Sequence, residues 1–113
     1  MRLLLGTHIF LWFVYGDPQL SALARALIED PIHTKYLSVA SIWEMAIKVS
    51  TGKFKISQPV DVFFAKQIRR NDVNLLPIEL AHAARVATLP IHHCDPFDRL
   101  SVAQPLVENM PLL

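Results

Sequence analysis

Short apolar runs alternate along the chain with longer segments in which apolar positions recur every three or four residues. The runs are typical of buried strands: RLLL (2–5), KYLSV (35–39), NLLPI (74–78) and MPLL (110–113). The longer segments predict helices near 8–15, 18–29, 40–51, 59–70 and 79–88, and a last helix that begins within DPFD (95–98). Because strands separated by helices need crossover connections, we expect a three-layer α/β fold, with a mainly parallel sheet and helices on both faces.

Pro105 interrupts the last predicted helix, within DRLSVAQPLVEN. A proline inside a helix lacks the N–H that a helical hydrogen bond needs, which costs about 3 kcal/mol or more. We therefore expect a kink or an early end at this position.

Length and composition narrow the class of protein. The chain has 113 residues, enough for one domain over 1–113, and 52% of them are apolar, so we expect part of the apolar surface to meet a partner. The net charge of +1 provides no strong overall field for nucleic acid, and any such binding must be local. A single cysteine excludes an internal disulfide and is compatible with a reducing cytosol.

The opening segment MRLLLGTHIFLWFVYGDP begins as a secretory signal does, with a basic residue before an apolar stretch. Thr7 and His8 interrupt that stretch, no small-residue cleavage site follows, and the segment is too short to span a bilayer. We therefore predict a cytoplasmic protein that does not associate with a membrane.

Acidic residues lie near the beginning of two of the predicted helices, one of which directly follows a predicted strand. In parallel α/β sheets, ligands bind beyond the carboxyl ends of the strands, so these positions are candidate site positions. Glu44 follows KYLSV, and Asp95 and Asp98 open the last helix. Each acid also has a purely structural interpretation: Ser41 and Glu44 fit a capping box, while Asp95 fits an N-cap before Pro96 and Asp98 a favourable first-turn charge.

The segments MRLLLGTHIFLWFV, YLSVASIWEMAIKVSTGK, LLPIELAHAARVATLPIHHCDPFDRLSVAQ and ENMPLL together resemble the PIN-domain proteins of VapC type. These proteins are the toxin components of type II toxin–antitoxin pairs. The resemblance extends from Met1 to Leu113 in one register, and it rests on the joint occurrence of these segments.

The resemblance implies a Mg²⁺- or Mn²⁺-dependent endoribonuclease that a cognate antitoxin of VapB type inhibits, and it also implies a homodimer. Glu44 matches the second acid of the family pattern and Asp98 the third, with Asp95 as a neighbouring acid. Thr7 matches the threonine that supports the first acid. We therefore expect Glu44, Asp95 and Asp98 to be the catalytic and metal-binding residues, because Mg²⁺ and Mn²⁺ prefer oxygen ligands and activate water for attack on a phosphate.

Two departures from the family pattern affect this site. Gly6 stands where the pattern has its first aspartate, and the chain stops at Leu113, before the segment that carries the last acid, so we expect the last strand to be incomplete. An alternative function is therefore a catalytically degenerate PIN domain that retains only antitoxin binding or dimerisation. If the acids converge, Glu44 and Asp98 should face one cleft that Gly6 lines.

Other chemistry-bearing residues carry weaker signals. HHCD contains His92, His93 and Cys94 in a row, but no second pair of zinc ligands has the required spacing. Six basic residues are candidates for RNA contacts, with Arg99 as the supporting residue to test first: Lys48, Lys53, Lys55, Arg69, Arg70 and Arg99. The aromatics on helical segments fit a core, a groove or a dimer contact better than a base-stacking platform: Phe10, Trp12, Phe13, Trp43, Phe63 and Phe64.

Overall fold

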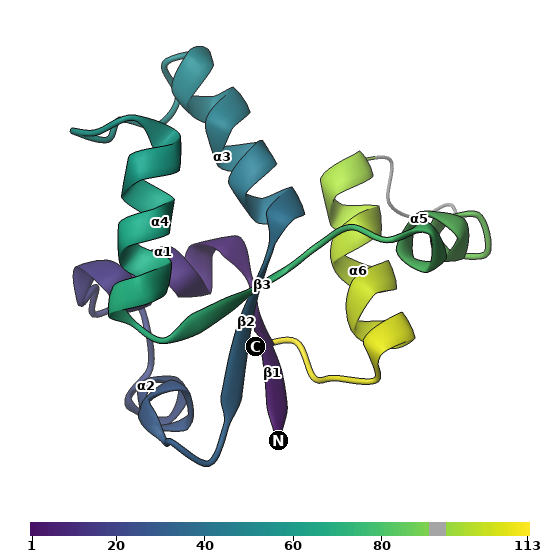
Figure 1. The fold of residues 1–113 in the computed structure, drawn as a ribbon, viewed down its shortest axis with the longest axis horizontal. Coiled ribbons are helices and arrows are strands. Elements are labelled where there is room, and N and C mark those ends of the chain that lie inside the picture. The colour runs from purple at the N-terminus through teal and green to yellow at the C-terminus, as the bar shows by residue number, and fades with distance from the viewer. Residues whose placement is uncertain (91–94) are drawn as a thin grey trace.

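A computed structural model describes residues 1–90 and 95–113, which form a parallel sheet surrounded by helices (Figure 1). The strands are β1 (Arg2–Leu5), β2 (Thr34–Ser38) and β3 (Val73–Leu76). The helices are α1 (Thr7–Tyr15), α2 (Ala22–Glu29), α3 (Val39–Ser50), α4 (Val60–Arg70), α5 (Leu80–Val86) and α6 (Pro96–Glu108). Each of the three strands coincides with a predicted apolar run, to within two residues at either end.

The three strands are parallel and lie in the order β1-β2-β3. Leu5 pairs with Leu37, and Leu37 pairs with Leu75, so the apolar runs lie side by side in register. Figure 1 shows α1, α2 and α4 on one side of this sheet, and α5 and α6 on the other. The predicted three-layer α/β fold is therefore confirmed.

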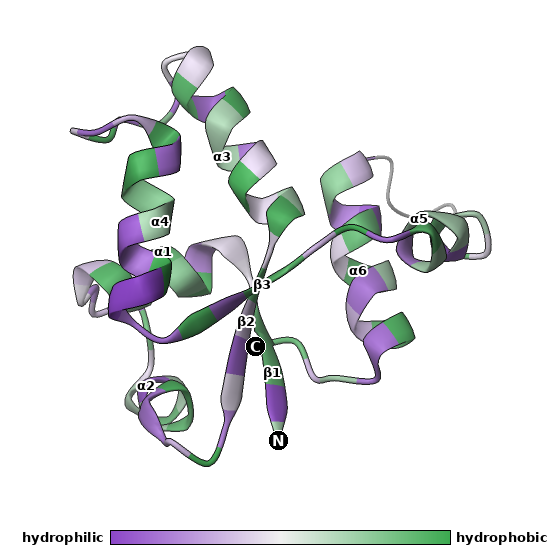
Figure 2. Cartoon of the chain, in the orientation of Figure 1, coloured by the Kyte–Doolittle hydropathy of each residue, from purple (hydrophilic) through white to green (hydrophobic). Residues whose placement is uncertain are grey.

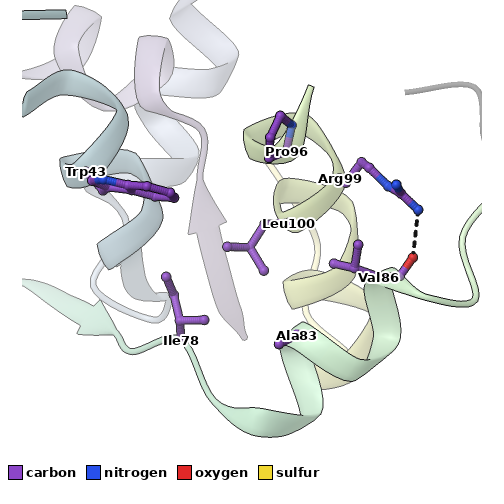
Figure 3. Close-up of a pocket in the computed structure, with 7 residues that line it drawn as sticks. All are labelled: Trp43, Ile78, Ala83, Val86, Pro96, Arg99 and Leu100. Atoms are coloured by element: carbon purple, nitrogen blue, oxygen red, sulfur yellow. Dashed lines mark hydrogen bonds between the residues drawn. The ribbon is translucent and has the colours of Figure 1, made fainter. Parts of the chain in front are cut away.

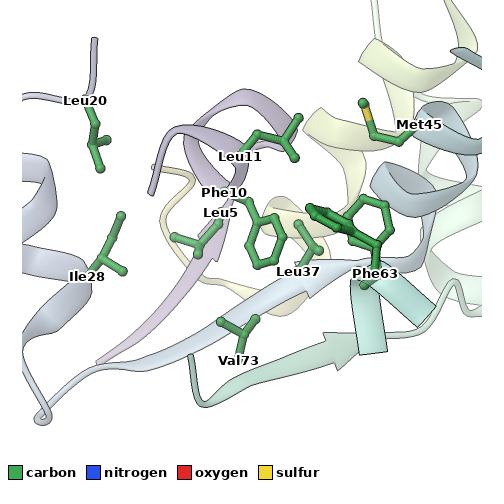
Figure 4. Close-up of a cluster of buried hydrophobic side chains, with 10 residues drawn as sticks. Leu5, Phe10, Leu11, Leu20, Ile28, Leu37, Met45, Phe63 and Val73 are labelled. Carbon is green, nitrogen blue, oxygen red and sulfur yellow. The ribbon is translucent and has the colours of Figure 1, made fainter. Parts of the chain in front are cut away.

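Alternation along the strands divides the core between the two faces of the sheet. Leu5, Leu37 and Val73 face the larger cluster (Figure 4). Helices α1, α2, α3 and α4, with Leu20 from the turn before α2, complete it with Phe10, Leu11, Leu20, Ile28, Met45, Phe63 and Phe64. Leu4 and Leu76 face the smaller cluster, with Met110. In Figure 2 green and purple segments alternate on α4 and α6, as expected for helices that bury one face and expose the other.

The C-terminal segment of the chain lies against the outer edge of β1. Leu4 N–H donates to the Pro111 carbonyl over 3.0 Å, and Leu113 N–H donates to the Leu4 carbonyl over 2.8 Å. Leu112 forms a single parallel bridge with Leu4. The MPLL run, predicted as an incomplete last strand, therefore forms only an isolated bridge within the described residues, and this bridge is to β1.

Two helix boundaries differ from the sequence prediction. The second helix begins at Ala22 and not near residue 18, because Ser21 is its N-cap and accepts a hydrogen bond from Ala24 N–H. The last helix does not end early at Pro105 but continues to Glu108. Pro105 lies in the last turn, so its missing N–H removes only one hydrogen bond near the helix end.

Candidate active site

The start of α3 differs from the capping box that Ser41 and Glu44 suggested. Ser38 is the N-cap, and its hydroxyl accepts a hydrogen bond from Ala40 N–H over 3.0 Å. Ser41 and Glu44 therefore lie inside the helix, one turn apart on the same face. The capping interpretation of Glu44 is wrong, because strand β2 leads directly into the helix and the earlier serine caps it.

Glu44 is held from one side by a hydroxyl and from the other by an ammonium group. Thr7, the first residue of α1, donates from Oγ1 to Glu44 Oε1 over 3.1 Å, and the same Thr7 oxygen lies 2.9 Å from Ser41 Oγ. Lys48 Nζ lies 3.7 Å from Glu44 Oε2, one turn further along α3. These contacts fix both carboxylate oxygens in a partly buried position.

Gly6 lines a small hollow of about 50 Å³ at the base of α3 and α6, which we call the Gly6 hollow. It is lined by Leu4, Leu5, Gly6, Ser38, Ser41, Ser101, Gln104 and Leu112, none of them an acid. Gly6 has an extended backbone with a φ of −65°, so its conformation does not require glycine. Glycine therefore leaves this position without the carboxylate of the family pattern, and a Cβ atom here would lie 3.3 Å from the Leu113 carbonyl oxygen.

Asp95 and Glu44 line the same hollow of about 180 Å³, the Glu44 hollow, together with Ile47, Lys48, Thr51, Lys53 and Phe97. Asp95 is also the N-cap of α6, and its carboxylate accepts a hydrogen bond from Phe97 N–H over 2.8 Å. The capping interpretation of Asp95 is therefore confirmed. Capping occupies Oδ1 and leaves the second carboxylate oxygen available for a ligand.

Asp98 lies in the first turn of α6 and is exposed. It is three residues before Ser101, so helical geometry puts it on the face of α6 that borders the Gly6 hollow. Arg99 points elsewhere: its Nη2 donates to the Val86 carbonyl over 3.0 Å and ties α6 to α5. Asp95 therefore lines the same hollow as Glu44. Asp98 instead lies one helical turn before Ser101, which lines the Gly6 hollow.

The donor set of the site suits a hard divalent cation. Within residues 1–90 and 95–113, no three His, Cys, Asp or Glu side chains come together as a potential metal site. Mg²⁺, however, keeps several of its waters and is commonly bound by one or two carboxylates plus substrate phosphate. Glu44 and Asp95 are the two carboxylates that would hold such a cation, because they line one hollow.

Trp43 lines a third hollow of about 330 Å³, the Trp43 hollow, with Ile78, Ala83, Val86, Pro96, Arg99 and Leu100 (Figure 3). Its side chain is 53% exposed, and its ring meets the Phe97 ring edge-on, with centroids 4.8 Å apart. Trp43 therefore lines a groove, one of the roles expected for the aromatic residues. Phe10, Phe63 and Phe64 are instead core residues.

A hydrogen-bonded network of buried polar side chains lies next to the Gly6 hollow, and no pattern in the sequence indicated it. His82 is fully buried, its Nδ1 accepts from Glu79 N–H over 3.0 Å, and its Nε2 therefore carries the proton that it donates to Glu108 Oε2 over 2.7 Å. This hydrogen bond and the nearby Arg2 guanidinium lower the pKa of Glu108 below its ordinary value of 4.5. Gln104, also fully buried, accepts a hydrogen bond from Ser38 and so links α6 to the start of α3.

The comparisons with known proteins agree with this fold. The family model of the PIN domain matches residues 3–113, and the chain therefore belongs to the PIN domain family. The structure is similar to a crystal structure of VapBC2 from Rickettsia felis bound to a DNA fragment from their promoter, with a TM-score of 0.71 and 18% identity over 99% of this chain and 86% of that one.

A curated relative is ribonuclease VapC16 from Mycobacterium tuberculosis, which is 32% identical over 74 residues. That match covers 62% of this chain and 52% of the relative, so the aligned segment is about half the relative's length. His92, His93 and Cys94, which the sequence offered as a weak zinc candidate, lie outside the described residues. In the described part of the chain, no helix has the length and apolar character that a membrane span needs.

Proposed function

We propose that this chain is an endoribonuclease of VapC type that cleaves RNA phosphodiester bonds with the help of Mg²⁺ or Mn²⁺. The observation that carries the proposal is the placement of Glu44 in a PIN domain: Thr7 holds its carboxylate, and Asp95 lines the same hollow. The similarity to ribonuclease VapC16 supports the same activity. A cytoplasmic location suits an RNA substrate and a chain with one cysteine.

In this proposal Glu44 and Asp95 hold the cation, and Asp98 joins them from the first turn of α6. A bound divalent cation supplies an activated water and neutralises charge on the phosphoryl group that is attacked. Thr7 and Ser41 orient Glu44, so its carboxylate is in place before the RNA arrives. The N-terminal end of α6, at Asp95, adds a favourable potential for phosphate.

We further propose that a VapB-type antitoxin inhibits the chain and that the chain forms a homodimer. The crystal structure of similar fold contains a VapB together with its VapC. Large apolar side chains remain exposed on this chain, among them Trp43, Ile78 and Leu80. Such surface is typical of a protein that meets a partner.

The test is cleavage of RNA by the purified chain with Mn²⁺ or Mg²⁺, compared with Glu44→Gln and with Glu29→Gln. Glu29 lies on the exposed face of α2, so its substitution makes the same charge change away from the site. We expect Glu44→Gln to lower the cleavage rate by about 100-fold, since a ligand to the cation is lost, and chelation by EDTA to abolish cleavage. Glu29→Gln should retain the parent rate.

Equal rates for the parent chain and Glu44→Gln would overturn the assignment of Glu44. A parent chain that binds a VapB-type antitoxin tightly but cleaves no RNA with either cation would overturn the enzymatic proposal. The catalytically degenerate PIN domain would then be the function, with Gly6 as the residue at which the metal site fails.

A further inference from the structure

The Glu44 hollow is lined by two lysines as well as two acids. Lys48 and Lys53 lie on the α3 side of this hollow, and Asp95 lies on the α6 side. Lys48 is paired with Glu44, with a side chain that is 34% exposed, so its ammonium is accessible from the hollow. The two carboxylates suit a cation, but the two ammonium groups beside them repel a cation and therefore need a different explanation.

The turn after α3 brings Lys53 back to Lys48. Gly52 has a φ of +76°, a left-handed conformation that favours glycine, and its N–H donates to the Val49 carbonyl over 3.2 Å. Lys53 N–H then donates to the Lys48 carbonyl over 2.8 Å. These two bonds form a Schellman motif, which reverses the chain and puts both lysines at one end of the helix.

Lys53 is exposed, and no carboxylate in the described part of the chain lies within 4.0 Å of its ammonium group. Its charge is therefore not offset by an ion pair, whereas that of Lys48 is shared with Glu44. An ammonium group has three N–H donors, so Lys48 binds an anion without releasing Glu44. Both lysines line the hollow.

We propose that Lys48 and Lys53 bind backbone phosphates of single-stranded RNA at the α3 side of the Glu44 hollow. An ammonium group on a flexible stem binds phosphate as a point charge and needs no particular base. The two lysines would position the strand beside the acids without reading its sequence. This inference rests on the proposed ribonuclease function, because it names the residues that hold that substrate.

The experiment measures binding of a short single-stranded RNA over a range of salt concentrations, in EDTA, which removes the cation that the proposed cleavage requires. The variants are Lys48→Met, Lys53→Met and Lys66→Met. Lys66 is exposed on α4 and provides the matched control, since its substitution makes the same change in net charge outside the Glu44 hollow. Lys48→Arg keeps the charge at the first position.

We expect Lys48→Met and Lys53→Met each to weaken binding several-fold and to lower the slope of log K against log salt by about 0.7, the value for one contact to a single strand. Lys66→Met and Lys48→Arg should bind as the parent chain does. Thermal unfolding of each variant establishes that the fold is retained. Lys48→Met also breaks the ion pair with Glu44, whereas Lys53→Met breaks no ion pair among the described residues. Weaker RNA binding by Lys53→Met therefore reports the loss of a phosphate contact alone.

If Lys53→Met and Lys48→Met bind RNA as Lys66→Met does, the phosphate-binding role is wrong, and cleavage by the parent chain would still support the ribonuclease. If the parent chain binds RNA through these lysines but cleaves none, the lysine proposal stands and the enzymatic one fails. A parent chain that neither binds nor cleaves RNA overturns both.

Discussion

Thr7 has one hydroxyl hydrogen and two oxygen neighbours, Ser41 Oγ and Glu44 Oε1. An ionised carboxylate accepts hydrogen bonds and cannot donate one, so the Thr7 hydrogen goes to Glu44 and the Ser41 hydroxyl donates to Thr7. The resulting chain from Ser41 through Thr7 to Glu44 has a single direction. It orients the Glu44 carboxylate by bonds within the protein, at the boundary between the Gly6 and Glu44 hollows.

Gly6→Asp restores the acid that the family pattern has at this position. A Cβ atom on Gly6 would lie 3.3 Å from the Leu113 carbonyl oxygen, so the residue fits if Leu113 shifts by a few tenths of an ångström. We expect Gly6→Asp to bind Mn²⁺ more tightly than the parent chain, because an added anionic oxygen offsets the dehydration of the cation. Titration calorimetry measures the affinity directly.

The double variant Gly6→Asp with Glu44→Gln tests whether the two carboxylates act on one cation. It should lose most of the gain, whereas Gly6→Asp with Glu29→Gln should keep it. At a fixed Mn²⁺ concentration, tighter binding stabilises the folded chain more, so the thermal midpoint gives a second measurement. A folded Gly6→Asp variant with the affinity of the parent chain would show that the acids do not converge.

Helices α5 and α6 are joined by the hydrogen bond of the buried His82 to the partly exposed Glu108, and this pair makes their docking depend on pH. The pKa of Glu108 is lowered, chiefly by the hydrogen bond from His82, so the unfolded chain takes up a proton before the folded one does. The stabilisation is therefore complete above pH 4.5 and is lost as the pH falls through the folded pKa. We expect Glu108→Gln to lower stability by about 1 kcal/mol or more near neutral pH.

Denaturant unfolding of the parent chain and Glu108→Gln, repeated from neutral pH into acid, measures this dependence. The difference between the two chains should shrink in acid, because the parent Glu108 is then protonated as well. Glu29→Gln is again the control, since Glu29 forms only an exposed ion pair with Arg25. A difference that stays constant with pH would show that Glu108 does not stabilise the fold as a carboxylate.

Most of the secondary structure could be predicted, because its signals are local. The strand runs 2–5 and 35–39 stand out by their apolar side chains. The second helix was predicted to begin near residue 18, and the Ser21 that caps its true start at Ala22 is a typical N-cap residue. The choice between Ser38 and Ser41 as the cap of α3 is not local. It depends on how far β2 extends along β1 before the helix begins.

The candidate site could be predicted only in part, for the same reason. The sequence predicted Glu44, Asp95 and Asp98 as members of one site, and Glu44 and Asp95 line one hollow, which Asp98 and Gly6 do not line. The contact of Lys53 with that hollow depends on the left-handed turn at Gly52, which sequence alone marks only as a helix end. His82 and Gln104 gave no signal, because a single polar residue on a helix looks the same whether it is buried or exposed.

Exposed apolar side chains on the whole molecule support self-association. Among the described residues, Leu80 is 87% exposed, Leu23 is 73% exposed and Trp43 is 53% exposed. Analytical ultracentrifugation over a range of concentrations should give a mass above the 12.8 kDa of one chain, which decreases on dilution. A mass of one chain at every concentration would contradict the homodimer.

The pairing of β1 with residues 111–113 also determines when the candidate site can fold during synthesis of the protein. Arg2 and Glu108, which are hydrogen-bonded beside this pairing, lie 106 positions apart in the chain. Contacts between such distant positions form late, since a long loop must close before they stabilise anything. During translation, the Gly6 N–H therefore reaches the Leu113 carbonyl only after residues 111–113 have left the ribosome. A nascent chain that has not reached these residues carries a candidate site with an unfinished floor.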